Sequence, residues 1–291
     1  MAPHPRRPRC RPAPGAPPAR WTPRRGGARL VGDGQGAAAL AYHVPADTPE
    51  GRRLVGRLAL LDVARGTVRR THTVGADPDV VVDAALEPGP PGPVAYLAVW
   101  RPAARTDGRW RPAAGRILAV DALTGAGLGA AVLPGPPAQL RLARAPGGAE
   151  RVLYCLGGGL GPEGDPGAEA DLVAGGPRRL LALDPSTLLP EHEHALPHPV
   201  RALAVAPDGD AAYALDAAGR RAVVRVDLRT GTTRRLAALP GAGAALAVTR
   251  ERVYVADGRG AVWAIDARSG ALVGTLAVGR GPIGLALSGS V

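Results

Sequence analysis

The sequence predicts an all-β domain built from repeated four-stranded antiparallel sheets, and three observations carry this prediction. Five short apolar runs each contain a tyrosine, and a second apolar run ending in aspartate follows each of them. A turn sequence containing Gly, Ser or Thr comes directly after every one of these aspartates. Apolar runs of roughly 4–8 residues between turn signals favour strands. No window of the chain shows convincing helical periodicity, so we expect a fold without helices.

The repeat is defined by its tyrosines and aspartates, which alternate along the chain. The tyrosines are Tyr42, Tyr96, Tyr154, Tyr213 and Tyr254, and the aspartates are Asp62, Asp121, Asp184, Asp227 and Asp266. Successive aspartates are 59, 63, 43 and 39 residues apart, and the last two spacings match the roughly 40–45 residues of a propeller blade. The sequence therefore predicts a single β-propeller. Five blades account for the visible repeats, or six or seven if some repeats were missed.

The two ends of the repeat region are complementary. Residues 283–287 have the pattern of a first blade strand, with no second strand after them. The first blade begins at residues 38–44, with no clear strand before them. Ring closure leaves only short, protected sheet edges. We therefore expect the C-terminal strand to close the first blade.

The last repeats carry a family resemblance. Residues 253–257 (VYVAD), followed by 262–266 (VWAID) and Ser269-Gly270, resemble the YVTN-type β-propeller repeat. The same family's turn and VGxxP link resemble residues 206–209 (APDG), 74–78 and 278–282. The resemblance covers about residues 30–291 and implies a fold in the superfamily of WD-repeat-like and quinoprotein-like propellers. Some similar propellers are lactonases, lyases or quinone-dependent dehydrogenases.

The net charge of +11 is concentrated in an N-terminal segment. Residues 1–29 contain eight Arg and no acidic residue, which leaves 28 Arg against 25 acidic residues in the rest. An Arg/Pro-rich segment with one large apolar side chain cannot form a core, so we expect a disordered tail at 1–29 and a propeller domain at 30–291. The tail could bind nucleic acid or an acidic surface, act in targeting, or remain a solvated extension.

Three long connections between the second and third strands of their blades are the main departures from the repeat. They span about 45–57, 99–116 and 157–179 and should emerge on one face. The second is rich in Trp and Arg, which are enriched at binding hot spots. The third is acidic, so the two could bind a partner or simply pair with each other. The candidate partner-binding residues are Trp100, Arg101, Arg105, Arg109, Trp110 and Arg111.

A second set of candidates lies in the links between blades, near the predicted channel mouth: Asp77, Asp79, His198 and Arg280. They are sparse for an enzyme, and the chain has no P-loop, dinucleotide fingerprint or nucleophile elbow. We assign no catalytic residue, no metal site and no cofactor. The repeated tyrosines should pack between blades, and the repeated aspartates should cap turns.

The leading hypothesis is a non-enzymatic propeller that binds a protein or peptide through its long loops. The alternatives are an enzyme with its site at the channel mouth, and a propeller that binds nucleic acid or an acidic partner through its Arg-rich tail. Nucleic acid is the less favoured partner, because only one aromatic residue is interleaved with the tail arginines. We expect a monomer.

No run approaches 18 apolar residues, so we expect no membrane-spanning helix. Neither signal nor anchor is visible, which makes a cytoplasmic protein the default expectation. An export signal hidden by a misplaced start would instead place the protein outside the cytoplasm.

Overall fold

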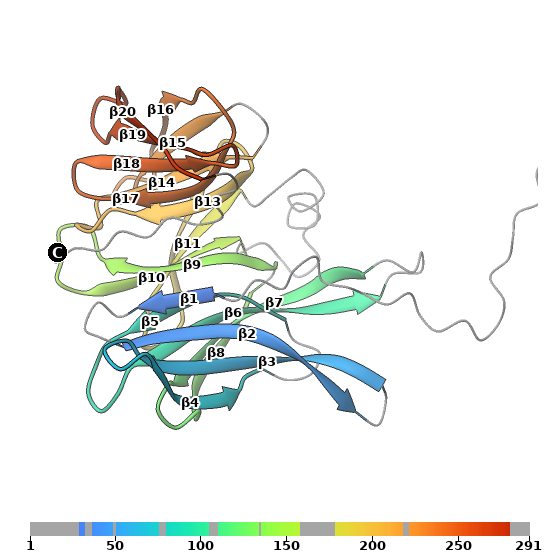
Figure 1. Ribbon diagram of the computed structural model, residues 1–291. Coiled ribbons are helices and arrows are strands. Elements are labelled where there is room, and N and C mark those ends of the chain that lie inside the picture. The colour runs from blue at the N-terminus through green and yellow to red at the C-terminus, as the bar shows by residue number, and fades with distance from the viewer. Residues whose placement is uncertain are drawn as a thin grey trace, which may run out of the picture.

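Five four-stranded antiparallel sheets follow one another along the chain in the computed structural model of this protein (Figure 1). The structure describes residues 29–32, 37–48, 51–75, 80–104, 110–133, 135–157, 178–217 and 221–279. Over these residues the regular elements are all strands, and the architecture is that of a β-propeller. The predicted fold class, with blades of four antiparallel strands, is therefore confirmed. The Arg-rich segment 1–28 lies outside the described residues.

Each sheet takes its four strands consecutively from the chain. The first comprises β1 (Arg29–Gly32), β2 (Ala37–Thr48), β3 (Gly51–Asp62) and β4 (Thr67–Thr73). The second comprises β5 (Val80–Glu87), β6 (Val94–Ala104), β7 (Trp110–Asp121) and β8 (Gly127–Leu133). The third comprises β9 (Pro137–Arg144), β10 (Arg151–Gly157), β11 (Arg179–Leu183) and β12 (Pro190–Ala195). The fourth comprises β13 (Val200–Val205), β14 (Ala211–Asp216), β15 (Ala222–Asp227) and β16 (Thr233–Ala238). The fifth comprises β17 (Gly243–Val248), β18 (Arg252–Asp257), β19 (Ala261–Asp266) and β20 (Leu272–Ala277).

The first strand of the first sheet comes from the N-terminal side of the chain. β1 pairs with β2 from Arg29 opposite Ala41 to Gly32 opposite Ala38. The place next to β2 that we predicted for residues 283–287 is thus occupied by β1, and that expectation is corrected. The strand was not evident in the sequence because it has only two large apolar residues and follows an Arg-rich segment. Residues 283–287 lie outside the described part of the chain.

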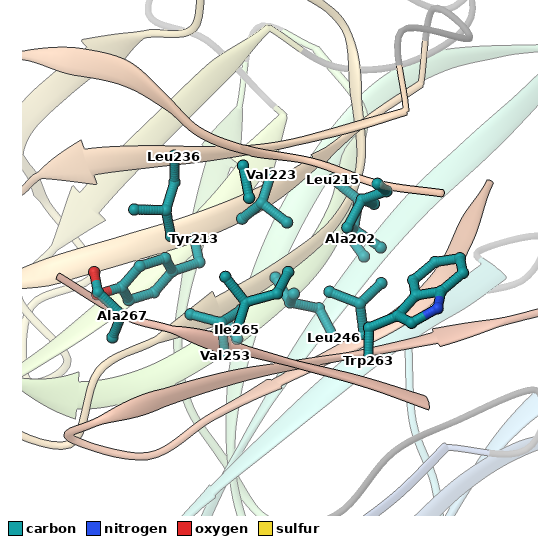
Figure 2. Packing of buried hydrophobic residues seen from close by; sticks show 14 of the residues in the cluster. Ala202, Tyr213, Leu215, Val223, Leu236, Leu246, Val253, Trp263, Ile265 and Ala267 are labelled. Atoms are coloured by element: carbon teal, nitrogen blue, oxygen red, sulfur yellow. The ribbon is translucent and has the colours of Figure 1, made fainter. Parts of the chain in front are cut away.

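The hydrophobic core is divided among the junctions between consecutive sheets. One buried cluster joins the first and second sheets, a second joins the second and third, and a third joins the third and fourth. Figure 2 shows the cluster between the fourth and fifth sheets, where Tyr213 and Leu236 face Val253 and Ile265. Fully buried side chains such as Leu58 and Leu97 each contribute roughly 1.5–3 kcal/mol by leaving water.

Four of the five repeated tyrosines occupy the same structural position. Tyr96, Tyr154, Tyr213 and Tyr254 each lie opposite the residue two before the repeated aspartate of their sheet. The first three are 1–4% exposed and pack between sheets, as predicted. Tyr42 is different, because it lies opposite Arg57, and the equivalent position in the first sheet is Ala39 opposite Leu60. The tyrosine pattern in the sequence is therefore offset in the first repeat.

Candidate partner-binding face

Two hairpins extend beyond the body of their sheets. The β2–β3 ladder continues without interruption to Thr48 opposite Gly51. The β6–β7 ladder continues to Ala104 opposite Trp110, with one shift at Arg101/Pro102. The corresponding β18–β19 ladder stops at Ala256 opposite Val262. Figure 1 shows both long hairpins running toward the right of the view.

The first two insertions were predicted as loops and are largely strands instead. Similar lengths were added to both strands of each hairpin, so the antiparallel ladder could continue and pair the backbone N–H and C=O groups. Two-stranded ribbons result, which we call the first ribbon (residues 42–48 and 51–57) and the second ribbon (residues 100–104 and 110–115). Most of the third insertion, residues 158–177, lies outside the described residues.

The ribbons leave the sheets beside the links that connect one sheet to the next. The backbone N–H of Val74, just after β4, donates to the carbonyl oxygen of Gly56 at 3.0 Å. In the second sheet, a Cβ added to Gly115 would clash with the carbonyl oxygen of Gly135 in the next link. The ribbons and the inter-sheet links therefore share one face, as the order of strands in a blade predicts.

The second ribbon carries the predicted partner-binding residues that the structure describes. Trp100 is half-buried at its base, opposite Gly115 on β7 and Val80 on β5. Farther out, Arg101 lies opposite Ala114, Arg111 opposite Ala103, and Trp110 opposite Ala104. Arg105 and Arg109 lie outside the described residues. Trp100, Arg101, Trp110 and Arg111 are thus placed on one hairpin.

The predicted channel-mouth residues are not brought together by the described part of the chain. His198 is half-buried in the link between β12 and β13. Asp77, Asp79 and Arg280 lie outside the described residues. Their assignment stays a prediction. Among the described residues, no group of three or more His, Cys, Asp or Glu side chains could hold a metal ion.

The structure reveals a polar seam along the innermost strands that was not predicted from the sequence. Asp83 of β5 is 4% exposed and accepts hydrogen bonds from the backbone N–H of Leu140 and from the Arg141 guanidinium, both at 3.0 Å. Arg141 of β9 also donates through Nε to the carbonyl oxygen of Leu203 on β13, at 2.9 Å. Gln139 completes the seam by accepting from the backbone N–H of Leu203 at 2.8 Å.

This seam joins the inner strands of three consecutive sheets. Its hydrogen bonds are directed at neighbouring backbone groups and at the Asp83–Arg141 ion pair. Such an arrangement holds strands in register and accounts for a buried acid in an otherwise apolar strand. The one signal of it in the sequence is Asp83 itself, which interrupts the apolar run Val80–Leu86.

The five repeated aspartates cap turns, as predicted. We call them the rim aspartates. Asp266, for example, accepts from the backbone N–H groups of Arg268 and Ser269, at 3.1 and 2.8 Å, and from the Ser269 hydroxyl at 2.9 Å. The backbone hydrogen bond from Ser269 is the main cause that lowers the Asp266 pKa to about 2. The same capping pattern recurs at Asp62, Asp121, Asp184 and Asp227.

The cysteine of the core is also structural. Cys155 is fully buried between the second and third sheets. Burial raises the pKa of its thiol far above the usual range. A protonated, inaccessible thiol is unsuited to nucleophilic chemistry, which agrees with the prediction that it is a small core residue.

Comparison with known proteins shows similarity in the fold alone. No protein-family model and no curated protein match the sequence. A chain from a crystal structure of the mitotic checkpoint complex is 14% identical, with a TM-score of 0.53 over 88% of this chain. This chain spans 64% of that chain. A structure of Sqt1 from Saccharomyces cerevisiae is 11% identical, with a TM-score of 0.48 over 88% of this chain and 86% of that one. Among the described residues there is no helix long and apolar enough to cross a membrane.

Proposed function

We propose that this propeller is a non-enzymatic scaffold that binds a protein or peptide partner on the face bearing the two ribbons. The observation that carries the proposal is the extension of two neighbouring hairpins past their sheets on the side of the inter-sheet links. A repeat fold does not need these extensions for its core. In proteins with a rigid scaffold, binding residues concentrate in segments that depart from the regular fold in this way.

Both ribbons offer unpaired strand edges. β1 pairs with β2 only as far as Ala41, and β4 pairs with β3 only as far as Arg57. In the second sheet, β5 reaches Trp100 and β8 reaches Gly115. Beyond these points no other described strand pairs with the ribbons. An extended partner segment could therefore add to a ribbon edge through main-chain hydrogen bonds.

The composition of the second ribbon indicates the chemistry of the partner. Residues 100–115 contain four Arg and two Trp against one Asp. Trp supplies a large contact area and Arg supplies paired hydrogen bonds to carboxylates. These side chains favour an acidic partner segment. The similarity in fold to a chain of the mitotic checkpoint complex supports a role in protein assembly at the level of the scaffold.

The enclosed space that the structure shows favours a surface contact over a small-molecule site. A recess between the fourth and fifth sheets has a cavity volume of only about 10 Å³ and is lined by Arg201, Asp216 and Arg221 among others. Small-molecule sites usually enclose roughly 300–1,000 Å³.

A shortened second ribbon tests the proposal. Trp100 and Gly115 lie directly opposite each other, so replacing residues 101–114 by Asn-Gly should close a tight hairpin there. We expect this variant to keep the melting midpoint of the full chain. A photo-crosslinking residue at position 104 of the full chain should give one stoichiometric product in native lysate. The product should be lost when an excess of the unlabelled full chain competes, and should persist when the shortened variant competes.

A matched probe at position 132 supplies the control. Val132 is 75% exposed on β8, away from the ribbon tips. A product from position 104 alone supports the proposal. The same product from both positions, or equal competition by the full and shortened chains, would overturn it.

A further inference from the structure

The packing of one sheet on the next repeats at a fixed set of positions. The residue four after each rim aspartate has positive φ in every sheet: Gly66 (62°), Gly125 (77°), Leu188 (59°), Gly231 (72°) and Gly270 (76°). We call it the turn residue. A Cβ added at Gly125 would clash with the His72 ring of the preceding sheet. A Cβ added at Gly231 would lie 3.1 Å from His194 Nδ1 of the preceding sheet. A Cβ added at Gly270 would instead clash with the backbone of Leu236, one residue before the equivalent position on β16. The turn residue of one sheet therefore receives the outer strand of the preceding sheet.

The outer strand of the preceding sheet supplies the other half of each junction. We call the residues six and eight positions after the turn residue the junction residues. In the first four sheets they are buried or half-buried, while the residue between them is exposed. This alternation turns one side of the strand toward the next sheet. The junction residues of these sheets are His72 and Val74, Ala131 and Leu133, His194 and Leu196, and Ala237 and Leu239.

The fifth sheet presents the same junction residues to solvent. Leu276 is 64% exposed and Val278 is 36% exposed, although both are large and apolar. On the same face, Tyr254 is half-buried, whereas the equivalent Tyr96 and Tyr154 are 2% and 1% exposed. The junction residues of the fifth sheet are thus present, but no other described sheet covers them.

The first sheet presents the receiving half. Around its turn residue, Gly66, the described structure places no heavy atom within 4 Å of an added Cβ. Leu40 and Tyr42, on the same side of the sheet, are half-buried. Their equivalents in the second sheet, Leu97 and Val99, are both 0% exposed.

We propose that two copies of this chain associate head to tail, with the fifth sheet of one copy packed on the first sheet of the other. The contact repeats the packing of one sheet on the next, which occurs four times within the chain, and places Leu276 where His72 and His194 lie in two of these junctions. Leu276 would lie over the Gly66 turn of the second copy as His72 lies over Gly125. Within one copy, both Leu276 and the turn at Gly66 are left uncovered. The described residues therefore form no such junction between the fifth and first sheets of the same chain. The proposal replaces the expectation of a monomer.

The two surfaces in this contact determine which assemblies can form. The two surfaces are different, so the interface is heterologous and each copy retains one open half after the first contact. A two-fold pair closes by forming two identical junctions, and a rotation other than two-fold would give a larger ring or a filament. Association should therefore depend on concentration and should stop when either half is blocked.

Sedimentation of the full chain measures this association. At increasing concentration we expect the mass to rise from one 29.5-kDa chain toward at least twice that value. Leu276→Asp should weaken association at least tenfold, because it places an unpaired charge in the junction. Val132→Asp, at a 75% exposed position between two junction residues of the second sheet but on the opposite side of the strand, should associate like the unmodified chain. A mass of one chain at every concentration, or equal weakening by both substitutions, would overturn the proposal.

A disulfide test identifies the two surfaces in contact and distinguishes contact between two copies from contact within one chain. The background carries Cys10→Ser and keeps the buried Cys155. Ala64→Cys, in the turn before Gly66, and Leu276→Cys are made in separate chains, mixed and mildly oxidised. A cross-linked dimer in the mixture, several times more abundant than from either chain alone, supports the contact. No such enrichment would overturn it, as would an intramolecular disulfide in a third variant that carries both substitutions in one chain.

Discussion

His43 should contribute to stability through a single hydrogen bond between the first two sheets. Its Nε2 atom accepts the backbone N–H of Val81 at 2.9 Å. Val81 is 6% exposed, so water cannot readily replace this acceptor. His43→Leu replaces the ring by an apolar side chain of moderate size and leaves the backbone N–H of Val81 without its acceptor. The substitution therefore tests the bond with little change in the volume of the side chain.

The expected effect follows from the cost of leaving a buried donor unpaired, which is about 1–3 kcal/mol. Each kcal/mol shifts the melting midpoint of a domain of this size by roughly 2–4 °C. We therefore expect His43→Leu to lower the midpoint by roughly 2–12 °C at pH 7.5. His192→Leu, an exposed histidine on β12, provides the control and should leave the midpoint within about 1 °C.

The same bond predicts a pH dependence of known sign. Burial lowers the pKa of His43 below its usual value of 6.5, and the neutral ring accepts the Val81 hydrogen bond in the folded protein. The stability that this neutral ring provides is present above pH 6.5 and is lost as the pH falls through and below that value. The leucine variant has no such loss, so its difference from the unmodified chain should narrow between pH 7.5 and 5. Equal midpoints at pH 7.5, or a constant difference across this range, would refute the reasoning.

Three further predictions concern the repeat. In urea unfolding at low protein concentration, Gly125→Ala should destabilise the folded chain more than Gly66→Ala. Both glycines have positive φ, but only Gly125 packs against a histidine ring. Equal unfolding midpoints of the two variants would contradict this. Asp266→Ala should unfold at lower urea than the unmodified chain at pH 7, and the difference should shrink below pH 4 as the carboxyl protonates. Arg141→Met should cost about 1–3 kcal/mol by leaving Asp83 without its guanidinium, and Arg141→Lys should recover part of that loss in the same assay.

Much of the fold follows from local turn chemistry in the sequence. Each rim aspartate is followed by a turn sequence that contains Gly, Ser or Thr, so all five turns can be located from the order of residues alone. The positive φ of Leu188 is the exception that the sequence does not mark. Once these turns are fixed, the flanking apolar runs must be strands of the same sheet. β1 could not be placed in this way, because it has four residues and no turn of this type defines it.

The candidate face was harder to predict because its strands contain proline. Pro45, Pro102 and Pro112 interrupt the long insertions and are usual signs of a loop. Ribbon edges that lack a further strand tolerate proline, since the missing N–H has no ladder partner to lose. The polar seam was missed for another reason. Its partners Asp83 and Arg141 are 58 residues apart, and only the register between blades brings them together.

The repeat separates structural positions from binding positions in this protein. The rim aspartates and junction residues recur and are explained by turns and packing, whereas the second ribbon and the open ends of the sheet series depart from the repeat. The two departures involve different elements, since the ribbon tip lies on β6 and β7 and the supplying junction residues follow the fifth rim aspartate. Leu276→Asp should therefore weaken association at least tenfold and leave cross-linking from position 104 unchanged. Loss of both would mean that the partner recognises the assembled pair instead of the ribbon of one copy.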